Sequence, residues 1–486
     1  MTEALIDYKE KYEALFIEYS NLRHELDQLK RLVFGSRHER FIPSIPQQQF
    51  ALGLAVEKIE TPSPVGIQTI EYTRKQKKES TEKIQTGRMK LPADLPREQV
   101  ILEPQQEVSG MKKIGEEITE ELERIPGKLF VRQYVRSKYA KPQGDGVVIA
   151  ELPARPIDKG IPGPGLLAQI VIDKYTDHLP IHRQLQRFAR EGIRLSSSTL
   201  TDWIGGTCAL LEPLYDTLKK KVLSADYLQA DETPIKVLDK DKKGTTHRGY
   251  HWVYHAPNER LVLFDYREGR GREGPNEILK DFKGHLQTDG YALYEDFDKR
   301  SGITLLNCMA HARRKFDEAK DNDLIKAEYA LTEIQQLYAV ERKAKTDELS
   351  VAERYELRQE KSVPVLQDFK MWMLENYKSV LPKSTIGRAL HYSLERFDKL
   401  MLYTSDGKLE IDNNLVENAI RPVAIGRKNY LFAGSHNGAK RAAMLYSFLG
   451  TCKINGVNPF EWLRATLEKI PTHPVNRLTE LLPGKV

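Results

Sequence analysis

The feature that most constrains the fold is a run of strand and helix patterns between residues 226 and 311. "DYLQADETPIKVL", "YHWVYHA" and "RLVLFDYRE" are short runs rich in β-branched and aromatic residues, and they predict three successive strands. "PNEILKDF" predicts a short helix, "HLQTDGYA" a strand, "YALYEDF" a second helix and "ITLLNCMAH" a last strand. The expected order is therefore three strands, a helix, a strand, a helix and a strand.

This order is that of a ribonuclease H-like α/β core, which we expect to comprise residues 223–316 and 406–436. Between the two parts, "EYALTEIQQLYAVERKAK" and "LQDFKMWMLENY" are charged and helical in pattern, so residues 317–405 are expected to form a helical insertion. The stretch "IDNNLVENAIRP" then begins a helix that returns to the core. Residues 437–486 are expected to form a C-terminal helical region.

Three acidic residues occupy related places in this order: Asp231 in the first strand, Asp289 at the end of the fourth, and Glu417 on the returning helix. Each also has an ordinary interpretation. Asp231 could flank a turn, Asp289-Gly290 is a common turn dipeptide, and Glu417 could complete a capping box with Asn414 or pair with Arg421. Taken together they favour a catalytic site, because carboxylates bind Mg²⁺, and two such ions about 3.5–4 Å apart can activate a nucleophile on a phosphodiester.

The N-terminal part is predicted to contain a coiled coil and a linker. Leu15, Leu22 and Leu29 lie seven residues apart, so residues 1–41 resemble a short leucine zipper, although a surface helix could show the same stripe. Residues 42–95 are rich in Pro, Gln and Lys and show no sustained period, which is typical of a linker.

Two further segments precede the core. Residues 96–155, around "FVRQYVRSKYA", predict a small β-containing module. Residues 156–222 contain two helical patterns interrupted at Gly192, with serines from Ser196 onwards placed to cap the second helix. These are the ingredients of a helix-turn-helix, and ordinary helical hairpins share them. The fold class expected for the whole chain is multidomain α+β.

Composition limits the classes of function. In 486 residues, Lys and Arg total 75 against 69 acidic residues, a net charge of +6 that is compatible with a polyanionic partner without establishing one. The three cysteines form no CxxC pair, so a reducing compartment is expected. No run of eighteen apolar residues occurs, so no membrane partner is expected. We therefore expect a soluble, cytoplasmic protein.

Several stretches resemble the DDE transposases of the insertion-sequence-66 family: "QADETP", "TDGYALYEDF", "NCMAHARRKFDEA" and the block from 411 to 463. The resemblance implies a bacterial, nucleoid-associated transposase that cleaves DNA at the ends of a mobile element and joins the freed 3′-hydroxyls to target DNA. It implies that Asp231, Asp289 and Glu417 are catalytic and bind two Mg²⁺ ions, for which Mn²⁺ can substitute. Expected supporting residues are Cys308, His311, Asn413, Asn414 and Arg421, and expected DNA-binding residues are Arg427, Lys428, Lys440, Arg441 and Lys453.

The zipper pattern, and the need to hold two element ends together, predict a homodimer or higher oligomer, and the resemblance also implies small accessory proteins encoded beside the chain. One departure concerns zinc: similar proteins often carry CxxC pairs in the segment matching residues 96–155, and this sequence has no cysteine before Cys208. We therefore expect a zinc-finger-like module that has lost its cysteines, and no bound zinc. His247, His251 and His255 are expected to be exposed polar residues. Two rival functions are a structure-specific nuclease of the same fold and a catalytically inactive DNA-binding regulator.

Overall fold

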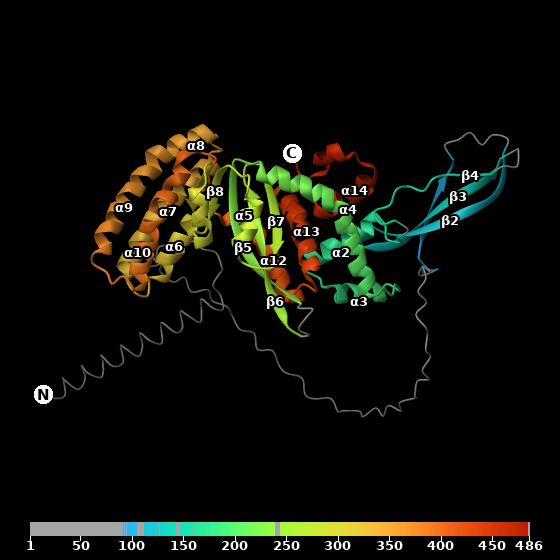
Figure 1. The fold of residues 1–486 in the computed structure, drawn as a ribbon, viewed down its shortest axis with the longest axis horizontal. Coiled ribbons are helices and arrows are strands. Elements are labelled where there is room, and N and C mark those ends of the chain that lie inside the picture. Colours follow the sequence, from blue (N-terminus) through green and yellow to red (C-terminus); the bar gives the residue numbers. More distant parts are fainter. Residues whose placement is uncertain are drawn as a thin grey trace, which may run out of the picture. The chain divides into compact units, whose positions relative to one another are not determined.

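The computed structural model describes residues 95–104, 111–125, 127–141, 146–158, 160–238 and 244–484, together with Leu91 and Ala93 (Figure 1). All of them belong to one unit of the chain, Lys83–Val486. The predicted coiled coil, residues 1–41, lies outside the described residues, as does nearly all of the predicted linker. No described helix is both long and apolar enough to span a bilayer.

A five-stranded sheet forms the centre of the described unit (Figure 1). Its strands run in the spatial order β7-β6-β5-β8-β9, with β5, β6 and β7 antiparallel and β5, β8 and β9 parallel. The bounds are Tyr227–Leu238 for β5, Thr246–Ala256 for β6, Leu261–Arg267 for β7, Gly284–Thr288 for β8 and Ile303–Asn307 for β9. Each strand falls within or overlaps a stretch that the sequence predicted to be a strand.

The connections differ from the prediction in detail. The first predicted helix is α5, Glu273–Ile278, which begins and ends earlier than "PNEILKDF". The second, η1 at Ala292–Lys299, is a 3₁₀ helix. The last four residues of "ITLLNCMAH" were wrongly assigned to a strand, because Cys308 is the N-cap of α6, Met309–Glu318.

Helices fill the segment between β9 and the returning helix (orange in Figure 1). They are α7 (Leu324–Thr346), α8 (Val351–Leu357), the π-helical turn η2 (Arg358–Ser362), α9 (Val363–Tyr377), α10 (Thr385–Glu395), α11 (Phe397–Met401) and η3 (Leu402–Ser405). The chain then returns to the sheet as α12, Asn414–Tyr430, which buries Val416, Ile420 and Val423. The helix that the sequence predicted to return to the core is therefore confirmed, and these three side chains form its buried face.

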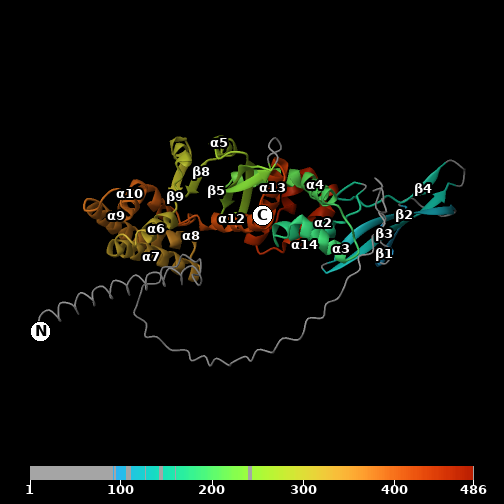
Figure 2. The same ribbon diagram turned by 90° about the horizontal axis from the view of Figure 1, so that it is seen from below.

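On the other side of the sheet, the helices that precede β5 in the chain pack against those that follow α12 (Figures 1 and 2). The elements are α2 (Pro164–Tyr175), α3 (Ile181–Arg190), α4 (Ser197–Leu223), α13 (His436–Ile454), α14 (Pro459–Lys469), η4 (Ile470–Thr472) and η5 (Val475–Leu481). The predicted break and cap are present: Gly192 has a φ of +86°, and Ser196 Oγ accepts a hydrogen bond from the Thr199 amide at 3.0 Å. Helix α13 protects the edge strand β7, because Ser447 Oγ accepts a bond from the Phe264 amide at 2.7 Å.

A second sheet contains β1 (Arg97–Leu102), β2 (Lys112–Ile125), β3 (Lys128–Ala140) and β4 (Val147–Ile149). Its order is β1-β3-β2, with β4 also pairing with β3. It meets the helices through α2, where the amide of Gly163 donates to the carbonyl of Leu122 at 2.7 Å.

Candidate active site

Asp231 lies on β5, and Asp289 directly follows the last residue of the neighbouring parallel strand β8. In the register of β5 with β8, Gln229 is the partner of Gln287, and each aspartate follows its glutamine by two residues. Because side chains alternate along a strand, the Asp231 carboxylate belongs on the face that carries Gln229. Burial raises the pKa of Asp231 well above its usual value, and the charges of Glu232, Asp289 and Glu417 raise it further. The structure therefore brings the three predicted acids into one electrostatic neighbourhood.

The turn after β8 holds Asp289 in place. Asp289 Oδ1 accepts a hydrogen bond from the Tyr291 amide at 2.8 Å, and the Tyr392 hydroxyl donates to the Asp289 carbonyl at 2.8 Å. Gly290, between Asp289 and Tyr291, has a φ of +83°, and a Cβ added to it would lie 2.9 Å from Arg396 Nε. The turn therefore requires glycine at this position, and the turn interpretation of Asp289-Gly290 agrees with a position in the site.

Glu417 lies in the first turns of α12. The capping-box alternative is wrong, because the helix begins one residue too early: Asn413 is the N-cap in place of Asn414, and its side chain makes no capping bond. Instead, Asp412 Oδ1 accepts a hydrogen bond from the Asn414 amide at 3.0 Å. Glu417 Oε1 lies 3.8 Å from His311 Nε2.

The predicted Cys308 and His311 pair is adjacent to the start of α12. Cys308 Sγ accepts a hydrogen bond from the Asn413 amide at 3.4 Å, and the Met309 amide donates to the Ile411 carbonyl at 3.1 Å. Burial raises the pKa of the Cys308 thiol, so the thiol is neutral at pH 7. Four of the predicted supporting residues, Cys308, His311, Asn413 and Asn414, are thus gathered around the base of the helix that carries Glu417.

A buried polar network ties the sheet to the turn before α12, and sequence reasoning missed it. Gln229 Nε2 donates to Gln287 Oε1 at 2.9 Å and to the Asp412 carbonyl at 2.8 Å. Gln287 Nε2 donates to the Glu410 carbonyl at 2.9 Å, and Tyr227 Oη accepts from the Glu410 amide at 3.2 Å. The only available signal was the presence of a glutamine two residues before each aspartate in otherwise apolar strands.

A second acid beside Asp231 was also missed. Glu232 forms an ion pair with Arg270, whose Nε lies 2.8 Å from Glu232 Oε1. The Arg270 guanidinium stands over the ring of Tyr291, 4.0 Å from its centroid. Arg270 thereby offsets the charge of Glu232 at the rim of the site.

The predicted DNA-binding residues do not gather in one place. Arg427 Nη1 donates to Thr233 Oγ1 at 3.0 Å, which holds this side chain against β5, two residues from Asp231. Lys428, Lys440 and Lys453 are exposed, as is the predicted supporting residue Arg421. Arg441 is half-buried and lines a separate cavity.

The expectation that three histidines of β6 are exposed is wrong for two of them. His251 is 1% exposed and His255 is 2% exposed, because β6 lies between β5 and β7 in the sheet. Helix α13 also covers the His251 ring, which lies 6.4 Å from the ring of Tyr446. The His251 ring lies 5.7 Å from that of Tyr266. Burial lowers the pKa of His251 to about 3 and that of His255 to about 4, so both are neutral at pH 7. His247 is exposed, as expected.

The donor types at the site suit a hard cation, since carboxylate oxygens are the ligands that Mg²⁺ prefers. The neighbouring acids that raise the pKa of Asp231 repel its negative charge, and a bound cation would relieve this repulsion. Within the part of the chain that the structure describes, no group of three or more His, Cys, Asp or Glu side chains is arranged closely enough to hold a metal ion.

Comparison with known proteins covers most of the chain. Residues 159–441 match the model described as "Transposase IS66 family", residues 447–483 match "IS66 C-terminal element", and residues 21–100 match "Transposase C of IS166 homeodomain". Among curated proteins, the uncharacterized proteins y4hP and y4qI of Sinorhizobium fredii are 33% and 34% identical, over 95% and 96% of this chain and 88% of each relative. The uncharacterized protein y4jD of the same organism is 32% identical over 95% of this chain and 94% of the relative. The chain therefore belongs to the IS66 family of transposases.

Proposed function

We propose that this transposase cleaves phosphodiesters at the ends of an insertion sequence and joins the freed 3′-hydroxyls to target DNA, with Asp231, Asp289 and Glu417 as its catalytic residues. The observation that carries this proposal is that Asp289, directly after β8, and Glu417, on α12, both lie close enough to Asp231 of the neighbouring strand β5 to raise its pKa.

The sheet supports a ribonuclease H-like core. Counted along the chain, its strands lie in the order 3-2-1-4-5, with the first three antiparallel and the last two parallel to the first. Asp231 lies within the first strand, and Asp289 directly follows the last residue of the fourth, at its carboxyl end, where an open α/β sheet usually binds its ligands. The packing of the returning helix α12 on β5 supports a role for Glu417 beside them.

The chemistry assigns a role to each acid. Two Mg²⁺ ions, when bound, would supply an activated oxygen nucleophile and stabilise the leaving oxygen. Asp231 and Asp289 would hold these ions from adjacent strands, and Glu417 would complete the set from α12. In the first step, water attacks phosphorus and the P–O bond to the 3′-oxygen breaks, leaving a 3′-hydroxyl. In the second, that hydroxyl attacks a target phosphodiester and displaces another 3′-oxygen.

His311 would orient Glu417. Its Nε2 lies 3.8 Å from Glu417 Oε1, which is slightly too long for a hydrogen bond and short enough to favour one carboxylate rotamer. This role is that of a positioning residue.

The test uses labelled element-end DNA, unlabelled target DNA and Mg²⁺. The expected products are nicked ends and joined molecules. Asp231→Asn, Asp289→Asn and Glu417→Gln should each abolish both products while preserving DNA affinity. Asp281→Asn and Glu356→Gln, which change exposed acids away from the site, are the matched controls. Nicks without joined products would instead establish a structure-specific nuclease, and DNA binding without either product would establish a regulator.

A further inference from the structure

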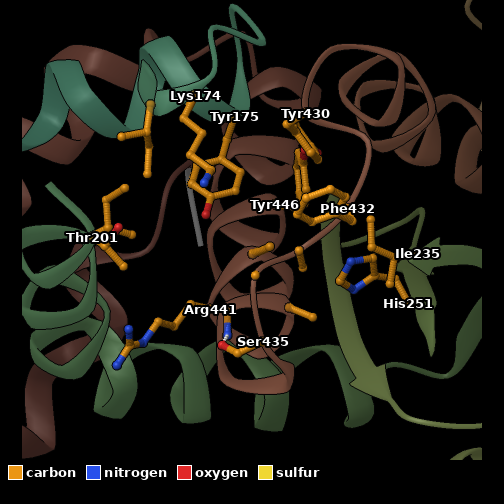
Figure 3. A pocket seen from close by; sticks show the side chains of 17 residues that line it. Lys174, Tyr175, Thr201, Ile235, His251, Tyr430, Phe432, Ser435, Arg441 and Tyr446 are labelled. Atoms are coloured by element: carbon orange, nitrogen blue, oxygen red, sulfur yellow. Dashed lines mark hydrogen bonds between the residues drawn. The ribbon is translucent and has the colours of Figure 1, made fainter. Parts of the chain in front are cut away.

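A cavity of about 270 Å³ lies between the helical region and the sheet (Figure 3). Helices α2 and α4 contribute Lys174, Tyr175 and Thr201, and strand β6 contributes His251. Ser435, the N-cap of α13, and Arg441 within α13 complete the polar lining. It is separate from the three acids, because none of them lines it.

The cavity contains cations and no acids. Lys174 and Arg441 line it, and its lining includes no Asp or Glu. In the described part of the chain neither cation forms an ion pair with a carboxylate. Burial lowers the pKa of Lys174, whose ammonium lies 5.4 Å from the centroid of the Tyr175 ring. Burying a cation without a counter-charge is costly, so an anion placed here would be stabilised.

Arg441 packs against a glycine of α4, and it lines both this cavity and a neighbouring pocket that contains four acids, Glu212, Asp216, Asp265 and Glu268. An added Cβ at Gly205 would lie 2.8 Å from Arg441 Nη1, so any larger residue would displace the guanidinium. The same helix carries Thr201, one turn earlier. The cation on α13 is thus packed directly against the helix that the sequence predicts to read DNA.

Hydrogen-bond donors complete the site. Helix α13 has 19 residues and no acid in its first turn, and its N-cap is Ser435, whose Oγ accepts a bond from the Gly438 amide at 3.0 Å. The serine hydroxyl hydrogen is therefore free to point at a ligand, and the first amides of the helix attract anions. Independently, His251 is 1% exposed and its Nδ1 has no hydrogen-bond partner. A neutral imidazole can donate from this atom.

We propose that this cavity binds a phosphate of the DNA backbone, held by Lys174, Arg441 and Ser435. The assignment rests on the proposed function, which supplies DNA as the partner. A backbone phosphate is favoured over a free one because the cavity lies between the first turns of α4 and the sheet. Phosphate contacts position a protein on its duplex, so a phosphate here would fix α4 relative to the active-site strands.

The first measurement is titration of the full-length protein with inorganic phosphate, by calorimetry at an ionic strength kept constant with chloride. We expect weak binding that Lys174→Met reduces about tenfold, since one charge-assisted hydrogen bond is lost. The control, Lys220→Met, removes an exposed lysine of α4 and should leave phosphate binding unchanged. Thermal unfolding of both variants checks that they fold.

The second measurement is the salt dependence of binding to duplex DNA without divalent metal, so that it does not depend on cleavage. Lys174→Met should lower the slope of log K against log salt by about 0.9, the value for one lost phosphate contact. Phosphate binding without this change would assign the cavity to free phosphate and overturn the DNA assignment. If Lys174→Met changes neither phosphate binding nor the salt dependence of DNA binding, the cavity proposal fails. The proposed function would still stand if Asp231→Asn abolishes cleavage.

Discussion

Gln229 and Gln287 connect the two aspartate-bearing strands to the turn that precedes Glu417. Each glutamine is fully buried, and each donates to a carbonyl of that turn. Buried amides are stable only when their hydrogen bonds are made, so the network fixes the turn in one position. At the scale of single residues, the distance from Glu417 to the aspartates therefore depends on side chains that do no chemistry.

Replacing Gln287 by Leu should lower the cleavage rate at saturating DNA at least tenfold and leave the DNA affinity unchanged. The variant leaves the Glu410 carbonyl unpaired, which should also lower the free energy of unfolding by about 1–3 kcal/mol. Single-turnover cleavage and urea unfolding measure the two effects. Gln99→Leu, at an exposed glutamine of β1, is the control. A stability loss with an unchanged cleavage rate would show that the network only supports the fold.

The sequence singled out the three acids as candidates and missed the glutamines beside them for a physical reason. Asp231, Asp289 and Glu417 are conspicuous because hard-cation chemistry requires carboxylates at a few places in a fold. A glutamine in an apolar strand has no such signature, since its partner depends on a register between strands some 60 residues apart. The burial of His251 and His255 was missed likewise, because it depends on α13, which follows almost 200 residues later.

At the scale of elements, the helices between β9 and α12 hold the turn from its other side. Arg358 is completely buried; its Nε donates to Glu341 Oε1 at 2.8 Å and its Nη2 to the Leu409 carbonyl at 2.7 Å. Arg354 Nη2 lies 2.9 Å from Glu410 Oε2. The predicted insertion thus contacts the segment that leads into α12, and it contributes to the placement of Glu417.

Arg358→Met should lower the free energy of unfolding by about 3 kcal/mol, because the buried Leu409 carbonyl loses its donor and Glu341 keeps only Arg354 as a partner. Urea unfolding tests this. The double variant Arg358→Met, Glu341→Leu should regain part of the loss, since it removes a buried carboxylate that has lost one of its two arginine partners. Arg342→Met, at an exposed arginine of α7, should have little effect. A loss no larger than that of Arg342→Met would mean that the buried ion pair contributes nothing.

Strand β2 should give the protein a measurable pH dependence. Burial, and then repulsion by Glu123, raises the pKa of Glu121 from 4.5 to about 7, against the opposing charges of Arg155 and Arg132, while Glu468 of α14 adds repulsion. Between pH 4.5 and about pH 7, Glu121 is protonated in the folded chain and largely ionised in the unfolded chain. The free energy of unfolding therefore falls as pH rises through this window. The loss is on the order of 3 kcal/mol by pH 7.

The Glu121→Gln variant should therefore lose this slope and be more stable than the parent at and above pH 7. Unfolding in urea between pH 5 and 8 measures the difference. Glu98→Gln, at an exposed glutamate of β1, should keep the slope of the parent. Parallel curves for the parent and Glu121→Gln would contradict the assignment to this residue.

The elements themselves were predicted well where hydrophobic periodicity decides them, and less well at their ends. All five strands of the central sheet follow from their apolar patterns. The boundary between β9 and α6 does not, because "CMAH" is as apolar as a strand, and the contacts at this boundary, of Cys308 with Asn413 and of Met309 with Ile411, join residues about 100 positions apart.

At the scale of the whole molecule, the proposed chemistry requires more than one chain. Joining two element ends to one target needs two active sites held together, and each chain has one set of Asp231, Asp289 and Glu417. The sequence offers a means of pairing in residues 1–41, which lie outside the described residues. The order of the strands could be read from the sequence, whereas the number of chains in the assembly could not, because it depends on an interface between copies.

We expect residues 1–35 to make the protein at least a dimer. Leu15, Leu22 and Leu29 at d, with Tyr12, Tyr19, Leu26 and Val33 at a, give a seam of about four heptads. A helix of that length is marginal without a partner, and tyrosine at a packs less well than a β-branched residue, so the affinity should be modest and reinforced by DNA.

The test compares the sedimentation of the full-length parent with that of a Leu15→Lys, Leu22→Lys double variant. Each change places a charge in the seam, so the variant should sediment as a smaller species and lose joined products before it loses nicked ones. A Glu13→Gln, Asp27→Asn variant changes the net charge equally at outward b positions and should retain the mass of the parent. If the lysine variant also retains that mass and joins paired ends, the leucines form an intramolecular packing face, and the pairing of active sites must come from the catalytic domains.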